Sequence, residues 1–171
     1  MALFNSTIGL IHLIAALVAL AAGTVVMYLP KGETTHRRLG YVYVVAMTVM
    51  LLTAFQIYAL FGVFGVFHWL AVVSSLTLAG GMLSLLFRLP KRSYLLYHLS
   101  FMFWSVVGLY MAFFGEMIAH LPALLDAGDD RIATVRVVIG ILGLVFVIGV
   151  QIFWRSKKKE WTGRYGTAVA D

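Results

Sequence analysis

Five histidines are the side chains of this sequence whose chemistry and spacing suggest a functional site. They are His12, His36, His68, His98 and His120. Each lies within or at the end of a long apolar segment, where an ionisable side chain is costly to bury and is a functional candidate for that reason. The chain has no cysteine, which excludes disulfides, thiolate-ligated iron–sulfur clusters and covalently attached c-type haem. A bound metal would have to use histidine, carboxylate or methionine ligands.

Four of these histidines form two pairs at two depths. His12 and His68 lie one to two turns inside the starts of the first and third apolar segments, and we name them the outer pair. His36 and His98 lie near the starts of the second and fourth segments, and we name them the inner pair. Two helices that run in the same direction and present imidazoles at similar depth can ligate one haem iron between them. We therefore predict non-covalent haem b at the outer pair and a second haem at the inner pair.

Small residues accompany the outer pair at helical spacing. Helical steps lead from His12 to Gly9, Ala16, Ala19 and Gly23, and from His68 to Gly65, Ser75 and Ala79. A stripe of small residues beside a ligand leaves room for a porphyrin. The same stripe also lets two helices pack closely without any cofactor. Both interpretations are compatible with the sequence.

A second set of ligands competes for the outer histidines. Glu116 and His120 are four residues apart in the fourth segment, so on a helix they share one face near the outer surface. Together with His12 and His68 they would form a site of three histidines and one carboxylate for zinc or iron. The structural alternative is an ion pair between Glu116 and Arg136 of the fifth segment.

The inner pair has a basic neighbourhood. His36 follows Thr34 and Thr35, which we predict to cap the second helix. Arg37 and Arg38 come directly after it and are candidates to contact haem propionates or an anionic substrate. Their structural alternative is anchoring in the lipid head groups. No residue is assigned a catalytic role by these patterns.

Five long apolar segments must position these side chains. The 171 residues are 62% hydrophobic and 12% charged, with a mean hydropathy of +0.96, which leaves too little polar surface for a soluble fold. About 20 apolar residues, rising about 1.5 Å each, cross a hydrocarbon core of about 30 Å. Each span must be helical, because lipid offers the backbone no hydrogen-bond partner. We predict spans at residues 8–29, 40–60, 64–87, 94–118 and 132–154, which form one transmembrane domain (1–154) before a solvated basic tail (155–171).

Charge placement predicts the orientation of these spans. Eleven of the thirteen basic residues fall on one side: Lys31, Arg37, Arg38, Arg88, Lys91, Arg92, Arg155, Lys157, Lys158, Lys159 and Arg164. The opposite side carries Asp126, Asp129 and Asp130 with Arg131. The positive-inside rule then predicts a multi-pass protein of the bacterial inner membrane with its amino terminus outside and its tail in the cytoplasm. The net charge of +6 thus reflects topology and lipid contact, and we do not expect a nucleic-acid partner. The first segment is longer than a signal-peptide core and no basic residue precedes it, so we expect it to be retained.

An internal repeat predicts how the helices are arranged. Gly9 to His12 matches Gly65 to His68, Leu29-Pro30-Lys31 matches Leu89-Pro90-Lys91, and His36 corresponds to His98. Duplicated hairpins of this kind form a four-helix bundle with a pseudo-twofold axis along the membrane normal. We therefore predict an all-α integral membrane protein, a four-helix bundle from two duplicated hairpins plus a fifth transmembrane helix. Gly140, Gly143 and Gly149 would let the fifth helix pack closely on the bundle.

Three stretches carry a resemblance to known families. They are Gly9 to Leu17, Thr35 to Val44, and His98 with Gly108-Leu109-Tyr110-Met111-Ala112 and Glu116. In them the first four spans resemble bacterial predicted inner-membrane proteins that carry a domain of unknown function, a likeness that implies no reaction. One histidine at the start of each of four successive helices is also similar to the two-haem transmembrane cytochromes b of the ascorbate-dependent ferrireductase type. That likeness implies one b haem on His12 with His68 and another on His36 with His98.

These observations together predict a haem-b-binding subunit of a membrane oxidoreductase. It would pass electrons across or along the membrane to a redox protein or a quinone, with the redox chemistry supplied by the cofactor. One alternative is a membrane zinc or iron protein that uses His12, His68, Glu116 and His120. Another is an accessory subunit of a membrane complex without a site of its own. Whether the chain is itself an enzyme, and its oligomeric state, are left open by the sequence.

Overall fold

Five helices make up the fold. The structure is a computed structural model that describes residues 6–57, 63–124 and 129–165, and it contains α1 (Thr7–Tyr28), α2 (Thr34–Ala54), α3 (Val66–Phe87), α4 (Tyr94–Leu124) and α5 (Asp129–Tyr165). Each helix includes a stretch long and apolar enough to cross a membrane. The predicted number of spans is therefore confirmed.

The second helix differs most from its predicted limits. α2 begins at Thr34 and not at residue 40, which makes His36 its third residue. Its N-cap is Glu33, whose side chain makes no capping hydrogen bond, so the predicted capping by Thr34 and Thr35 is wrong. α2 ends at Ala54 and α3 begins at Val66, so their connection is longer than predicted. Residues 58–62 of that connection lie outside the described part of the chain, as do Asp126 and residues 166–171 of the predicted tail.

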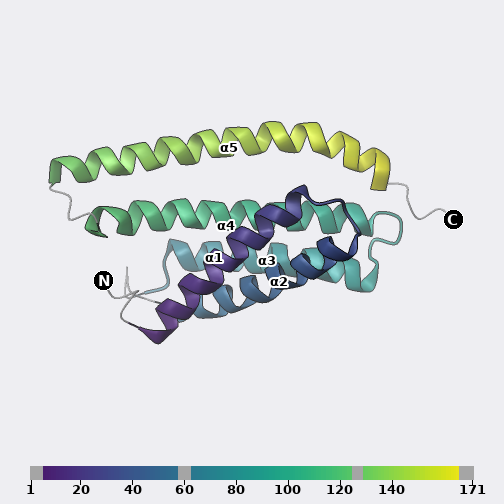
Figure 1. The fold of residues 1–171 in the computed structure, drawn as a ribbon, viewed down its shortest axis with the longest axis horizontal. Coiled ribbons are helices and arrows are strands. Elements are labelled where there is room, and N and C mark those ends of the chain that lie inside the picture. Colours follow the sequence, from purple (N-terminus) through teal and green to yellow (C-terminus); the bar gives the residue numbers. More distant parts are fainter. Residues whose placement is uncertain (1–5, 58–62, 125–128, 166–171) are drawn as a thin grey trace.

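The first four helices form a bundle of two hairpins. α1 packs mainly on α2 and α3 mainly on α4, while smaller contacts join α2 to α3 and α1 to α4. These contacts close a ring in which α1 lies diagonally opposite α3, and α2 diagonally opposite α4. Figure 1 shows the helices running along the long axis of the molecule, with α1 inclined to the others. The two-hairpin arrangement agrees with the predicted bundle, and its origin by duplication stays a prediction.

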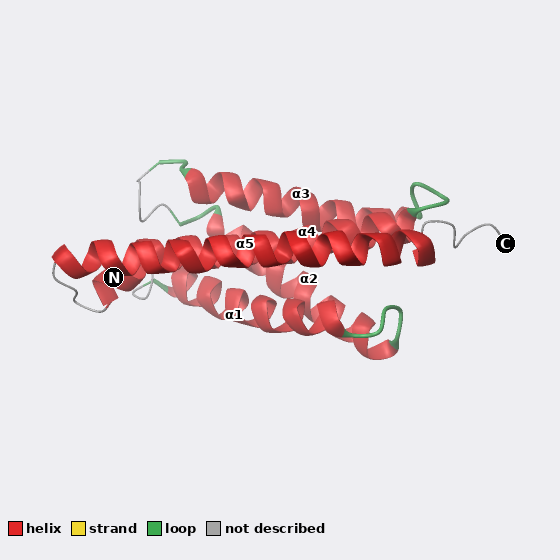
Figure 2. Cartoon of the chain, turned by 90° about the horizontal axis from the view of Figure 1, so that it is seen from above, coloured by secondary structure: helices red, strands yellow, loops and turns green. Residues whose placement is uncertain are grey.

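The fifth helix lies on the outside of this bundle. Among the described helices α5 contacts α4 alone, and it runs alongside α4 in both views (Figures 1 and 2). Aromatic side chains join the two helices: the ring centroids of Phe103 and Trp154 are 4.8 Å apart. A Cβ atom added at Gly140 or Gly149 would meet nothing within 4 Å. The predicted packing role of these two glycines is therefore wrong, because large rings fill the interface.

The end of α5 is more ordered than predicted. The helix continues to Tyr165, about 55 Å in all for its 37 residues. Trp161 is buried against Leu99 and Phe103 of α4. The first part of the predicted solvated tail is thus helical and packed on the bundle, because Trp161 supplies an apolar contact amid the basic residues.

The basic residues gather at one end of the bundle. The α1–α2 connection, the α3–α4 connection and the end of α5 all lie at the same end, on the right in Figure 1. The starts of α1 and α3 and the end of α4 lie at the other. We name these the inner and outer ends, to match the two histidine pairs.

Candidate functional site

His12 of the outer pair is held against the neighbouring helix α2. Its Nδ1 lies 3.0 Å from the carbonyl oxygen of Met50 and 3.0 Å from Oγ1 of Thr53. A carbonyl oxygen can only accept, so we assign the ring hydrogen to Nδ1, which donates to Met50. Nε2 then keeps its lone pair. This is the tautomer in which an imidazole binds a metal through Nε2 while its other nitrogen is oriented by the protein.

His68, its predicted partner, is used differently. The side chain is 4% exposed, and its Nδ1 accepts a hydrogen bond of 3.1 Å from the backbone N–H of Gly65. This contact closes the first turn of α3 in the manner of a capping box. The neutral ring therefore carries its hydrogen on Nε2. To bind iron through Nε2, His68 would have to exchange its bond with Gly65 for one in which Nδ1 donates.

His98 of the inner pair repeats the arrangement of His12. Its Nδ1 lies 2.8 Å from the carbonyl oxygen of Gly81 on α3. By the same reasoning Nδ1 donates and Nε2 keeps its lone pair. His12 and His98 are thus each fixed by the backbone of the helix that packs against their own. The first belongs to the outer pair and the second to the inner pair.

His36 lies close to His98 at the inner end. It is half-buried in the first turn of α2, and its Nδ1 has no hydrogen-bond partner among the described residues. The carbonyl of Val26 lies beside its ring, and the charges of Lys31 and His98 act on it. The two inner histidines, on the diagonal helices α2 and α4, therefore lie within electrostatic reach of each other.

Lys31 is the neighbour of the inner pair that the sequence analysis missed. Its Nζ donates to the carbonyl oxygens of Val26 at 3.0 Å and Met27 at 2.8 Å, at the end of α1. Its charge acts on both His36 and His98. Burial, with a smaller contribution from the charge of Lys157, lowers the pKa of Lys31 to about 8. The repeat Leu29-Pro30-Lys31 marked the position, but no spacing rule could indicate that its side chain folds back over α1.

The two arginines after His36 are exposed. Arg37 donates from Nε to the carbonyl oxygen of Gly32 at 3.0 Å. Arg38 is two residues after His36, about 200° around the helix, and so lies on the opposite face of α2. Of the basic residues in this region, Lys31 is the one beside both inner histidines. A propionate contact for Arg37 or Arg38 stays a prediction.

The outer carboxylate has a partner on its own helix. Glu116 Oε2 and His120 Nε2 are 3.1 Å apart, and α4 continues beyond them to Leu124. Glu116 therefore pairs with His120 and not with Arg136, whose side chain is exposed. Within residues 6–57, 63–124 and 129–165 no group of three or more His, Asp or Glu side chains is placed to hold a metal ion. His12, His68, Glu116 and His120 are thus not assembled into one metal site.

The small residues near the outer pair serve helix packing. Ala19 is fully buried, and a Cβ atom added at Gly23 would lie 2.8 Å from the ring of Tyr43. On α3 the buried face runs through Ala71, Ser74 and Leu78, while Ala79 of the predicted stripe is exposed. Close approach of the helices accounts for Ala19 and Gly23, the second of the two interpretations that the sequence left open.

Comparison of the chain with protein-family models, with curated proteins and with solved structures finds no match in any of the three. A function must therefore be argued from the geometry and chemistry of the site itself. The residues that carry that argument are the two histidine pairs and Lys31.

Proposed function

We propose that the protein is a membrane electron-transfer subunit that binds haem b between histidines on diagonally opposite helices. The observation that carries this proposal is common to His12 and His98. Each donates from Nδ1 to a carbonyl oxygen of the adjacent helix, at 3.0 and 2.8 Å, and keeps the Nε2 lone pair for an iron. Haem needs only two protein ligands, so its binding does not require the larger ligand group that the described residues lack. This reasoning favours haem over the zinc or iron alternative.

The inner pair is the better supported of the two sites. His36 and His98 lie within electrostatic reach of each other and of Lys31. The Nδ1 of His36 has no competing hydrogen bond in the described part of the chain, and the Val26 carbonyl lies beside the ring. Lys31 would offset the negative charge of a propionate. Bound haem would supply one-electron redox chemistry, while the chain would ligate it, orient His98 through Gly81 and exclude water.

The outer pair would hold a second haem. His12 is already oriented by Met50 and Thr53, but His68 must first release the Gly65 N–H. Two haems at the two ends would connect the membrane faces, and electrons would pass between a membrane redox protein or quinone and the basic end. We propose that this end faces the cytoplasm of a bacterial inner membrane, because eleven basic residues gather there.

A visible spectrum of detergent-purified protein from haem-replete cells tests the proposal. Two imidazole ligands keep iron low-spin, so dithionite should produce sharp α and β bands. His98→Ala should remove or convert one haem and His12→Ala the other, leaving the remaining spectrum in place. His120→Ala is the matched control, because His120 is a partly exposed histidine near the outer end of α4, outside both pairs, and the substitution should leave the spectrum unchanged. A colourless, monodisperse wild-type protein would overturn the proposal, and zinc found in its place by elemental analysis would favour the alternative.

A further inference from the structure

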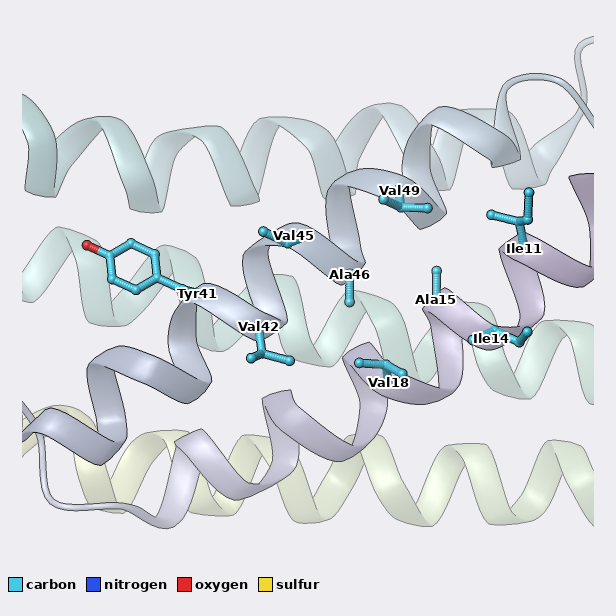
Figure 3. Close-up of a pocket in the computed structure, with 9 residues that line it drawn as sticks. All are labelled: Ile11, Ile14, Ala15, Val18, Tyr41, Val42, Val45, Ala46 and Val49. Carbon is cyan, nitrogen blue, oxygen red and sulfur yellow. The ribbon is translucent and has the colours of Figure 1, made fainter.

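An apolar groove runs between α1 and α2 on the surface of the bundle. It has a volume of about 530 Å³ and is lined by isoleucine, valine and alanine side chains together with Tyr41 (Figure 3). Ala15 and Ala46 point toward each other across its floor, and both are buried. Larger branched side chains such as Val18, Val42 and Val45 form its walls. Because α5 contacts only α4 among the described helices, it does not cover this groove.

A cationic side chain, Arg38, lies on the same face of α2 as the groove residues, toward the inner end of the bundle. Arg38 precedes Val42, Val45 and Val49 by four, seven and eleven residues, the spacing of one face of a helix. Its side chain is exposed and has no hydrogen bond or ion pair with any residue that the structure describes. The same helix face therefore offers an unpaired guanidinium followed by an apolar channel.

The length of the α2 face from Arg38 to Val49 is close to the thickness of one leaflet of the hydrocarbon core. Eleven residues from Arg38 to Val49 rise about 16 Å, close to half of a hydrocarbon core of about 30 Å. Arg38 lies in the second turn of α2, at the level of the other basic residues of the inner end. Tyr41 follows it by one helical turn, where aromatic side chains commonly meet the edge of the hydrocarbon.

We propose that this groove binds one anionic phospholipid of the leaflet at the basic end. Arg38 contacts the phosphate, since a guanidinium forms paired hydrogen bonds to phosphate oxygens. One acyl chain lies in the groove over Ala15 and Ala46, where the small side chains leave it space. Basic positions beside grooves between transmembrane helices are where anionic head groups bind. The charge of Arg38 and the apolar lining together fit a ligand with a negative head and a hydrocarbon tail.

Native mass spectrometry of the full chain released from nanodiscs tests this proposal. The nanodiscs contain equal amounts of phosphatidylglycerol and phosphatidylcholine of the same chain length. We expect one phosphatidylglycerol to be retained in preference to phosphatidylcholine. Both lipids carry a phosphate, but the choline ammonium makes the head group of phosphatidylcholine neutral and so weakens its attraction to Arg38. Arg38→Gln should reduce that preference about ten-fold, because it removes a charge-assisted hydrogen bond. Arg38→Lys keeps the charge but loses the paired hydrogen bonds, so it should keep part of the preference. Val45→Trp should fill the groove and lower retention of both lipids.

Matched controls separate a specific site from general lipid contact. Val138→Trp places the same bulk on the exposed surface of α5 and should leave retention unchanged. Equal retention of both lipids by the wild type and by Arg38→Gln would overturn the proposal and indicate a site for any hydrocarbon tail. The chain has no cysteine, so efficient self-cross-linking of Val45→Cys in membranes would assign the groove to a second copy and also overturn it. None of these measurements depends on haem.

Discussion

In both the outer and the inner pair, one histidine is oriented by a backbone carbonyl, but the charged residues near the two pairs differ. His12 and His98 are each oriented by a backbone carbonyl of the neighbouring helix. At the inner pair Lys31 acts on both histidines, whereas the outer end of α4 carries the carboxylate of Glu116. A nearby positive charge favours the reduced, less positive state of a haem. The same bundle would thus give the inner haem the higher reduction potential, and electrons would move from the outer end to the inner end.

The two pairs also differ in whether the second histidine, His68 or His36, would lose a hydrogen bond at Nδ1 on binding haem. His68 holds the first turn of α3 through its bond with Gly65, so ligation there costs a hydrogen bond. The Nδ1 of His36 holds no such bond among the described residues. Haem should therefore enter the inner site first when haem is scarce. Gly81→Val, Lys31→Gln and Thr53→Val test the differences between the two pairs, and their expected effects decrease in that order.

Gly81→Val should disrupt the inner site selectively. A Cβ atom at Gly81 would lie 2.7 Å from Sδ of Met102 and 3.4 Å from its backbone nitrogen. The added side chain would push α3 away from α4 and stretch the bond between His98 and the Gly81 carbonyl. We expect at least about ten-fold lower haem affinity at the inner site and a loss of about 1–3 kcal/mol in stability. Haem-to-protein ratios and thermal unfolding measure the two effects.

Gly140→Val is the control for that substitution. Nothing lies within 4 Å of a Cβ atom at Gly140, so it tests the cost of valine in a helix without a packing clash. It should keep both haems. If Gly81→Val removed the outer haem and kept the inner one, the assignment of His98 to the inner site would be wrong.

Glycine shows why only part of this structure could be predicted from the sequence. Gly23 meets the ring of Tyr43, yet Gly140 and Gly149 meet nothing, although all three stand in apolar helices with small residues nearby. The number of spans depends on length and composition along one segment, and the sequence contains that information locally. Which face of a helix is buried depends on side chains of other helices. For that reason the prediction of five spans and one basic end agreed with the structure. The predicted packing role is wrong for Gly140 and Gly149, whereas a Cβ atom at Gly143 would lie 3.7 Å from the ring of Phe114 on α4, as packing on the bundle requires.

At the candidate site, too, the sequence predicts the depth of a residue in the bundle but not its contacts with other helices. The depths of the four histidines follow from counting residues, and His36 and His98 lie within electrostatic reach of each other. The predicted rotation of α3 is wrong by about one residue, since Ser74 and not Ser75 is buried. Lys31 could not be placed because its contacts with Val26 and Met27 depend on how the chain turns after α1. Turn geometry and helix rotation are set by tertiary packing, which periodicity does not record.

Lys31→Gln should lower the reduction potential of the inner haem. It removes a positive charge beside His36 and His98, which should shift the potential downward by on the order of tens of millivolts. The pKa of Lys31 is lowered to about 8 by burial and Lys157. In the wild type this charge is present below pH 8 and lost above it, so the inner potential should fall as the pH rises through 8. The variant should lack this decrease.

Lys91→Gln provides the matched control in the second hairpin. Lys91 occupies the corresponding position of the Leu-Pro-Lys repeat and its side chain is exposed, so its charge is screened by solvent. Redox titrations followed at the α band should give unchanged potentials for both haems in this variant. A fall in the outer potential alone in Lys31→Gln would contradict the inner assignment.

Thr53→Val should have the smallest effect, and it acts at the outer site. Thr53 Oγ1 lies 3.0 Å from Nδ1 of His12. The single hydrogen of its hydroxyl is within donating distance of the carbonyl oxygens of Met50 at 2.8 Å and Val49 at 2.9 Å. The Met50 carbonyl remains available to His12 after the substitution, so the ring keeps its main anchor. We expect about three-fold faster loss of the outer haem to an acceptor protein, in line with about 0.5–1 kcal/mol for one neutral hydrogen bond. Thr53→Ser keeps the hydroxyl and should retain the wild-type rate. Complete loss of the outer haem in Thr53→Val would mean that the threonine, and not the Met50 carbonyl, orients His12, and the parallel between His12 and His98 would then fail.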